Sequence, residues 1–281
     1  MDNMKRVLIV TQGPAKEPFI HEMLFLFRSI LRFGGSLADS QKIVYFTGNI
    51  DSSLKEIFSS MGVHVHIIEE EIKEIPHANK IQMLHFSDKE DFDYLVMLDT
   101  DVVIARDFSN FIGIEKVGCK IASVDPLGME LWKNLFEYFG LELPTERYKT
   151  ALTMIETIPY FNSGVLIIPK KFVKSLYNIW KLYIFKMLEA YGELKEISQH
   201  RFFTDQIALA LALVDCKIPH YTLPVEMNFT LRGPYPQDHN PEFIDPYIIH
   251  HHHETDSNGK ILKCLHHTPN KAIDRVNSIL D

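Results

Sequence analysis

Cysteine is scarce in this chain of 281 residues, where Cys119, Cys216 and Cys264 are the only three and lie far apart. An odd number of scattered cysteines without a CxxC pair argues against a disulfide framework and indicates a reducing compartment. Long apolar runs are missing too, since none approaches the roughly 20 residues of a membrane helix. The run at 7–10 is too short for a signal peptide. We therefore expect a cytoplasmic protein without a transmembrane segment, and peripheral membrane contact through a local patch stays open.

An excess of positive charge is also lacking. The chain has 29 basic and 37 acidic side chains, a formal net charge of -8, which argues against a nucleic-acid partner. No G-x-G-x-x-G follows the first apolar run and no G-x-x-x-x-G-K-[ST] occurs, so dinucleotide binding and P-loop chemistry are unsupported. No G-x-S-x-G nucleophile motif is present either. The hydrophobic content of 46% and the length are those of a globular protein with a large core.

In the first half, short β-branched runs alternate with helical patterns. The runs that predict buried parallel strands are 6–10, 42–48, 63–68 and 94–99. The segments that predict helices between them are 17–32, 52–61 and 79–86. This alternation is typical of a Rossmann-like α/β unit, whose ligands bind at the carboxyl ends of the strands.

The second half has a more mixed pattern. Strand-like segments occur at 120–125 and 160–169, and helical segments at 171–194 and 204–214. We expect Thr204 to be the N-cap of the last of these helices. Segments 224–229 and 246–254 are late strands or loops. Because no repeat or linker interrupts the chain, we expect one α/β domain with a mixed, mainly parallel sheet flanked by helices.

Two carboxylates interrupt one of the most apolar stretches. In "VMLDTDVVI", Asp99 and Asp101 are separated only by Thr100. Residues two apart on a strand share a face, so both carboxylates can approach one point where the strand ends. Two close negative charges repel each other, and a divalent cation such as Mg²⁺ or Mn²⁺ removes that cost. The alternative is that one aspartate caps a turn and the other faces water.

Four consecutive histidines, His250 to His253, follow an apolar run in "YIIHHHHE". Alternate residues of an extended segment face the same side, so one imidazole is able to complete a metal site that the aspartates begin. An all-histidine zinc site is a competing interpretation. Exposed loop histidines without a ligand are a third.

Four segments resemble glycosyltransferases of the GT-A fold, especially family 8. These segments are "YLVMLDTDVVIARDFSNF", "YFNSGVLIIP", "TDQIAL" and "LPVEMNF", and they occur in the family's order. The resemblance covers about 5–270, with 126–155 poorly matched. It implies a single GT-A domain over 1–281, in which about 5–125 binds a nucleotide-sugar and 126–270 binds the acceptor.

The resemblance also implies a role for each matching residue. Asp99 and Asp101 would bind Mn²⁺ or Mg²⁺, which holds the diphosphate of the donor, and the third ligand would be His250 or His252, with His251 close behind. The residues placed at the donor are Lys80, Thr100 and Lys263, with Asp125 near its sugar. Asn162 and Ser163 would line the sugar and acceptor side, and Asp205 and Gln206 would lie near the reacting carbon. Asp205 would act as a base or as an electrostatic stabiliser. Lys263 either replaces the family's phosphate-binding lysine or is a plain surface residue.

The implied activity is metal-dependent transfer of a sugar from a nucleotide-sugar, with UDP favoured, to a hydroxyl group. The acceptor would be a glycan, a lipid-linked sugar or a small molecule, and family 8 enzymes retain the anomeric configuration. A sugar nucleotidyltransferase is one alternative, but its first loop should be rich in glycine and lysine, and "TQGPAKEPF" offers only Gly13 and Lys16. A degenerate scaffold that binds metal or glycan is another. The C-terminal "HETDSNGKILK" keeps it open, because that segment lacks the family's Pro-Trp.

Overall fold

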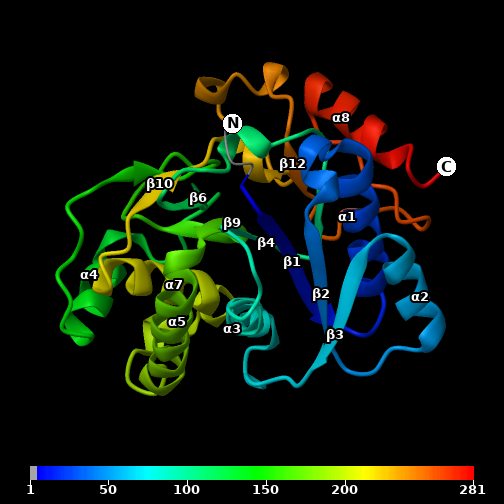
Figure 1. Ribbon diagram of the computed structural model, residues 1–281. Helices are drawn as coiled ribbons and strands as arrows, with labels where there is room; N and C mark the ends of the chain where they lie inside the picture. The colour runs from blue at the N-terminus through cyan, green and yellow to red at the C-terminus, as the bar shows by residue number, and fades with distance from the viewer. Residues whose placement is uncertain (1–4) are drawn as a thin grey trace.

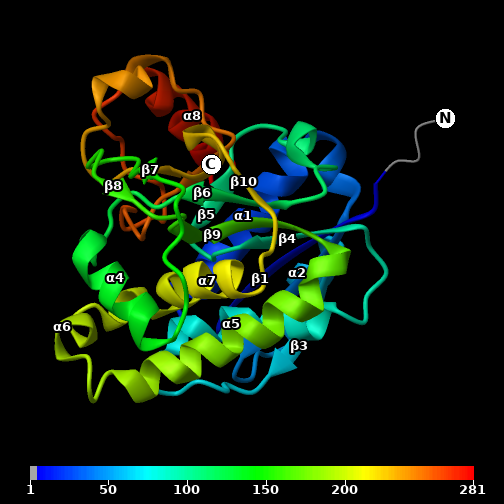
Figure 2. The same ribbon diagram turned by 90° about the vertical axis from the view of Figure 1, so that its left-hand side faces the viewer.

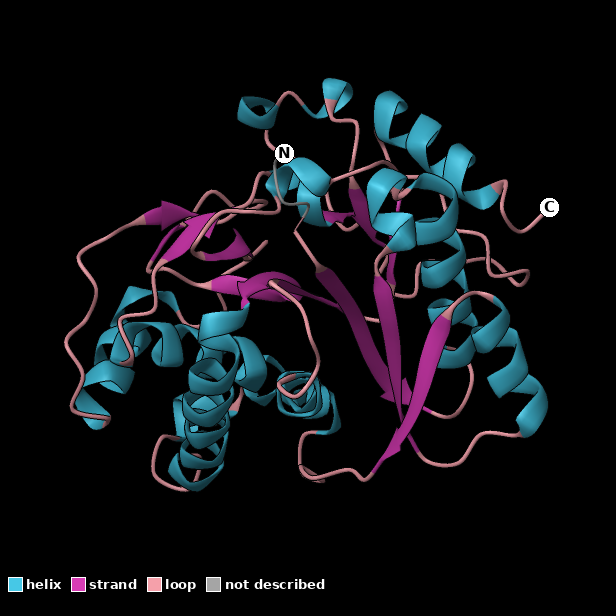
Figure 3. Ribbon diagram, in the orientation of Figure 1, coloured by secondary structure: helices cyan, strands magenta, loops and turns pink. Residues whose placement is uncertain are grey.

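A seven-stranded sheet forms the centre of the computed structural model, which describes residues 5–281 (Figures 1 and 3). Its spatial order is β10-β6-β9-β4-β1-β2-β3. In chain order the strands are β1 Val7–Pro14, β2 Gln41–Thr47, β3 Val63–Ile68, β4 Tyr94–Leu98, β6 Val117–Ile121, β9 Phe161–Pro169 and β10 His220–Thr222. Neighbouring strands are parallel except where β9 pairs with β4 and with β6. The prediction of a mixed, mainly parallel α/β sheet is confirmed.

Helices cover both faces of this sheet and bury a separate apolar cluster on each. On one face lie α1 (Phe19–Phe33) and α2 (Ser52–Ser60), at the right of Figure 1. The helices on the other face are α3 (Gln82–Ser87), α4 (Gly128–Tyr138), α5 (Lys170–Ala190) and α7 (Thr204–Asp215). Helices α5 and α7 pack side by side in front of the sheet in Figure 2. The short helix α6 (Lys195–Ser198) connects them.

A second, three-stranded sheet adjoins the carboxyl end of β4. Its order is β11 (Phe229–Thr230), β12 (Ile248–His250) and β5 (Val102–Ile104). Strand β12 runs antiparallel to β5, and the register pairs His250 with Val102. The C-terminal helix α8 (His267–Asn277) shares an apolar cluster with this sheet. The sheet therefore brings the histidine segment beside the residues that follow the two aspartates. A separate hairpin joins β7 (Tyr148–Lys149) and β8 (Glu156–Thr157).

Two local predictions were wrong. The strand expected at 120–125 is β6, Val117–Ile121, and the chain leaves the sheet after an irregularity between Cys119 and Ile121. Helix α7 begins at Thr204, but this threonine does not cap it. A 3₁₀ helix, Arg201–Phe203, runs directly into α7, and the Thr204 hydroxyl instead donates a hydrogen bond to the Arg201 carbonyl at 2.6 Å.

Other expectations agree with the structure. The three cysteines are free thiols. Within residues 5–281, no helix combines the length and the apolar character needed to cross a membrane.

Candidate active site

Asp99 and Asp101 lie in a turn between β4 and β5. The Asp99 backbone N–H donates to the Gly164 carbonyl of β9 at 2.9 Å, which extends the sheet to this residue. Thr100 between them is buried, and its hydroxyl donates to Glu22 Oε2 of α1 at 3.0 Å. The end of β1 lies against the same turn, because a Cβ atom on Gly13 would be 2.8 Å from the Thr100 methyl group. The turn is thus held from two sides. A contact of Thr100 with a donor stays a prediction.

The last residue of β12 and the turn after it place two imidazoles on Asp101. His250 Nε2 lies 3.1 Å from Asp101 Oδ1, and His252 Nδ1 lies 3.8 Å from Asp101 Oδ2. His252 and His253 have left-handed backbone angles, with φ of 50° and 63°, so the chain reverses after His250. The His252 ring consequently stacks on the His250 ring with centroids 3.8 Å apart. One ligand atom from each of Asp101, His250 and His252 lies within 4.8 Å of the other two.

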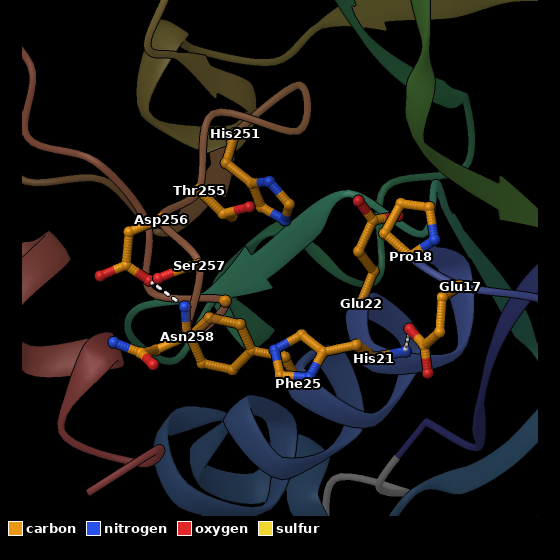
Figure 4. A pocket seen from close by; sticks show the side chains of 11 residues that line it. Glu17, Pro18, His21, Glu22, Phe25, His251, Thr255, Asp256, Ser257 and Asn258 are labelled. Atoms are coloured by element: carbon orange, nitrogen blue, oxygen red, sulfur yellow. Dashed lines mark hydrogen bonds between the residues drawn. The ribbon is translucent and has the colours of Figure 1, made fainter.

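His251 faces away from this group. It is buried and lines a cavity of about 340 Å³, and neither ring nitrogen has a hydrogen-bond partner among residues 5–281. Figure 4 shows this cavity between the start of α1, with Glu22, and the segment that follows the histidines. Glu22 also accepts a hydrogen bond from His253 Nδ1 at 2.5 Å. Of the four histidines, the structure therefore brings His250 and His252 to the aspartate and directs His251 and His253 toward α1.

A chain of amides sets the tautomer of His250. The Gly164 N–H and Asn228 Nδ2 both donate to Asn162 Oδ1 at 2.8 Å. This orients the Asn228 amide so that its Oδ1 faces His250 Nδ1 at 2.9 Å. Nδ1 must therefore carry a proton, and Nε2 faces Asp101 either as a second N–H or with a free lone pair. Metal-binding histidines commonly donate their other N–H in this way, which makes the ring orientation suitable for a cation.

The electrostatics of the two aspartates also fit a cation. Burial disfavours ionisation of Asp101, but His250 and then His252 outweigh it and hold the pKa of Asp101 below its ordinary value. Burial raises the pKa of Asp99 by more than the adjacent Lys80 lowers it. A divalent cation would stabilise both carboxylates in their charged form. The carboxylate and imidazole donors suit Mn²⁺, and the carboxylates suit Mg²⁺.

Gly164 marks the point where these side chains converge. A Cβ atom there would lie 2.7 Å from His250 Cε1, 2.9 Å from Asp99 Oδ2 and 2.9 Å from Asn162 Oδ1. These distances are too short for any side chain, so only glycine lets the backbone of β9 pass this close to the site. The glycine of the "FNSG" segment is therefore a steric requirement of the site.

Lys80 links the aspartate turn to α7. Its Nζ lies 2.6 Å from Asp99 Oδ1 and 3.5 Å from Asp205 Oδ2. Ser163 accepts a hydrogen bond from Lys80 at 3.2 Å and donates one to Asp205 Oδ2 at 2.5 Å. Burial opposes the charge of Lys80, but Asp99 and Asp205 outweigh it and raise the Lys80 pKa. Trp180 of α5 fixes the start of α7 by donating to the Asp205 carbonyl at 2.8 Å.

Three predicted site residues make no hydrogen bond or ion pair with this cluster among residues 5–281. The Asp125 carboxylate accepts from Trp132 Nε1 at 2.9 Å and from the Thr157 hydroxyl at 2.6 Å, and it also accepts from two backbone N–H groups at the start of α4. Gln206 follows Asp205 in α7 and makes no side-chain hydrogen bond within residues 5–281. Lys263 is exposed, with its Nζ 3.1 Å from Asp274. Their proposed contacts with a substrate stay predictions.

Two residues of the site were missed by sequence reasoning. Asn228 lies in the "LPVEMNF" segment, so the signal was present, but nothing in the residue pattern linked it to a histidine. Glu22 lies on the buried side of α1 and carried no signal, because its partners Thr100 and His253 are far away in the sequence.

Comparison with known proteins identifies the family. The sequence model of the Rhodobacterales glycosyltransferase domain matches residues 21–216, which is more than half of the chain and includes Lys80, Asp99, Asp101 and Asp205. No curated protein is detectably similar to the chain in sequence.

Solved glycosyltransferases share the fold. An active-site mutant of LgtC is 13% identical with a TM-score of 0.60, and the match covers 96% of this chain and 95% of LgtC. The bifunctional glycosyltransferase WbbM is 13% identical with a TM-score of 0.55, and the match covers 89% of this chain and 46% of WbbM. GlyE of Streptococcus pneumoniae is 14% identical with a TM-score of 0.54, and the match covers 98% of this chain and 63% of GlyE. This chain thus spans about half the length of WbbM and under two thirds of GlyE.

These matches favour glycosyl transfer over the nucleotidyl transfer and the non-enzymatic scaffold that the sequence left open. Membership of family 8 stays a prediction. The chain belongs to the Rhodobacterales glycosyltransferase domain family and is a glycosyltransferase with the GT-A fold.

Proposed function

We propose that this glycosyltransferase requires a divalent cation and moves a sugar from a nucleotide-sugar, with UDP favoured, to a hydroxyl group. The acceptor would belong to a glycan, a lipid-linked sugar or a small molecule. The observation that carries the proposal is the convergence of Asp101, His250 and His252 at the carboxyl end of β4, beside Asp99. The resemblance to family 8 adds the expectation that the anomeric configuration is retained.

The residues that would hold the cation are Asp99, Asp101, His250 and His252. When bound, Mn²⁺ or Mg²⁺ supplies a positive charge that stabilises the diphosphate as negative charge develops on it. Asn228 keeps the proton of His250 on Nδ1 and so leaves Nε2 for the cation. In the proposed mechanism, the protein's own contribution at this end of the donor is to keep these groups ionised and correctly oriented.

On the other side of the site, Asp205 and Lys80 would act on the sugar. Lys80 bridges Asp99 and Asp205, so it ties the position of Asp205 to the cation-binding turn. The Asp205 carboxylate would stabilise the positive charge that develops at the anomeric carbon or accept the acceptor's proton. Asn162 uses its Oδ1 in the amide chain, which leaves its Nδ2 to orient a hydroxyl group. Gln206 would do the same from α7.

Thermal unfolding with a panel of nucleoside diphosphates and nucleotide-sugars, with Mn²⁺ or with a chelator, tests the function. A ligand at about 100 times its dissociation constant adds about 2.7 kcal/mol to the free energy of unfolding. We expect one nucleotide to raise the melting temperature by several degrees, and only when Mn²⁺ is present. A rise with the metal alone, and none with any nucleotide, would contradict the proposed donor and indicate a metal- or glycan-binding protein.

Replacing Asn228 by alanine tests the positioning of His250. Without the amide oxygen, both ring tautomers become available and Nε2 is no longer reserved for the cation. Changes of this kind typically weaken metal binding by about 10–100-fold. We expect a loss in this range when Mn²⁺ binding is measured by titration calorimetry. The exposed Asn110→Ala variant is the control. Equal Mn²⁺ affinity in Asn228→Ala and the parent would show that Asn228 does not position a metal ligand.

A further inference from the structure

Lys120 is a buried lysine without a counter-ion, at the carboxyl end of β6. It is 3% exposed, and its one side-chain hydrogen bond goes to Ser123 Oγ at 3.4 Å. Within residues 5–281, no carboxylate lies within ion-pair distance of it. An ammonium group has three N–H donors, so two of them lack a protein acceptor. Burial accordingly lowers the pKa of Lys120 to about 7.

Lys42 shows what a purely structural buried lysine looks like in the same molecule. It is 4% exposed, and its Nζ donates to the carbonyls of Ala38 at 2.6 Å and Ser40 at 2.7 Å. Two short hydrogen bonds thus replace much of the water that Lys42 loses on burial. Among residues 5–281 Lys120 has no equivalent pair of acceptors, so the described protein groups do not compensate its burial.

Lys120 faces the side of the sheet that carries the proposed cation site. Cys119 and Ile121 of β6 belong to the apolar cluster under α5 and α7, so the alternation of the strand directs Lys120 to the opposite face. The 3₁₀ helix Val225–Asn228 packs against β6 there, and its Asn228 holds His250.

The register of β6 against β9 places Lys120 beside the cation site. The neighbours of Lys120 in β6 pair with β9 residues 166 and 161, so the β9 residues opposite Lys120 lie within 162–165. This range includes Asn162, which belongs to the amide chain that holds His250, and Gly164, where the side chains of the site converge.

The charges of the site leave a role for another cation. Asp99, Asp101 and Asp205 bring three negative charges, which Lys80 and one divalent cation neutralise. A diphosphate or any further acidic group then enters a site whose negative charges are already neutralised. In a buried environment this extra negative charge is costly unless a positive group lies beside it. Lys263 is unsuited to that role as it stands, because it is exposed and paired with Asp274.

We propose that Lys120 and Ser123 form an oxyanion subsite beside the cation site, which binds a phosphate or carboxylate oxygen of a substrate. The inference rests on the proposed function, since it assigns a further charged group to the substrates of that site. The oxyanion comes either from the diphosphate of the donor or from an acidic group on the acceptor. In both cases the free N–H donors of Lys120 bind it directly, and the Ser123 hydroxyl provides a second contact.

The test compares Lys120→Met with the parent protein. Methionine has a similar length and no charge, and Lys116→Met, an exposed position just before β6, is the matched control. One probe is inorganic pyrophosphate with Mn²⁺, and the other is inorganic phosphate added to protein already saturated with Mn²⁺ and a nucleoside diphosphate. We expect Lys120→Met to bind at least one probe about tenfold or more weakly by titration calorimetry, because a charge-assisted hydrogen bond is lost. Lys116→Met should bind both as the parent does.

The two probes separate the two sources of the oxyanion. Weaker pyrophosphate binding assigns the subsite to the donor, and weaker phosphate binding to the nucleotide-loaded protein assigns it to the acceptor. Lys120→Arg should recover part of the affinity. The methionine variant should melt at or above the parent temperature, because an uncompensated buried charge has been removed.

Equal affinity of the parent and Lys120→Met for both probes overturns the subsite, as does a parent that binds neither probe. Two further outcomes distinguish a failure of the subsite from a failure of the proposed function. If the parent transfers sugar from a nucleotide-sugar and Lys120→Met binds both probes as tightly as the parent, the subsite is rejected and the proposed function stands. If the parent binds no nucleotide-sugar but binds pyrophosphate more tightly than Lys120→Met does, the proposed function is rejected and the subsite stands.

Discussion

Asp101→Asn should lose metal-dependent binding of the donor while keeping its fold. The amide has nearly the shape of the carboxylate but lacks the negative charge that faces His250 and His252. Because Asp101 is the residue on which both imidazoles converge, we expect Mn²⁺ affinity to fall by about 100-fold or more, in line with the loss of a charged metal ligand. Titration calorimetry with Mn²⁺, followed by the most stabilising nucleotide, measures the effect.

The control for this variant is Asp91→Asn, which makes the same chemical change before the start of β4 rather than after its end. Asp91 is highly exposed and pairs with Arg6, so its loss should leave Mn²⁺ binding unchanged. An Asp101→Asn variant that binds Mn²⁺ and the nucleotide as tightly as the parent would eliminate the proposed site. Unfolding curves of both variants confirm that any loss is local.

Asp205→Asn should slow transfer and leave the cation site functional. The Asp205 carboxylate lies on the Ser163 and Lys80 side of the site, and the bond from Trp180 to its backbone does not depend on the carboxylate. Removing a group that stabilises charge at the reacting centre typically costs about 10²–10³ in kcat. We expect a loss in this range, with Mn²⁺ affinity close to that of the parent.

The matched control is Asp215→Asn at the other end of α7. Asp215 is exposed and accepts a hydrogen bond from Tyr183 at 3.0 Å, well outside the proposed site. Its kcat should equal that of the parent. If Asp205→Asn transferred sugar at the parent rate, Asp205 would be a structural partner of Lys80 only. If it lost Mn²⁺ binding instead, Asp205 would belong to the cation site.

The sequence was most informative where one pattern extends over many residues. The alternation of apolar runs and helical segments predicted the sheet and the helices on it. A strand that is buried on both faces, such as β4, must consist of apolar residues and is therefore visible in the sequence. The position of Asp99 and Asp101 followed from the same pattern, since a charged pair cannot lie inside such a strand and must follow its end. Which side chains of the site contact one another, in contrast, depends on residues that are far apart in the chain.

Asn228 illustrates that limit. Its function arises only when the 3₁₀ helix Val225–Asn228 meets β9 and β12, so that Asn162 and His250 lie on opposite sides of its amide. Whether His251 or His252 lies beside Asp101 likewise depends on the left-handed backbone at His252, which the pattern of residues does not predict. Asp125 was matched to a sugar contact by its place in the sequence, whereas its surroundings supply four donors of the protein itself.

The wide separation of the proposed cation ligands along the chain has a consequence for biosynthesis. His250 follows Asp101 by 149 residues, so a growing chain exposes the two aspartates long before the imidazoles leave the ribosome. All strands of the large sheet can pair during that interval, since the last of them in the chain, β10, ends at Thr222. The nascent protein would therefore lack the proposed cation site until β12 docks on β5, so cation capture would be a late step of its maturation.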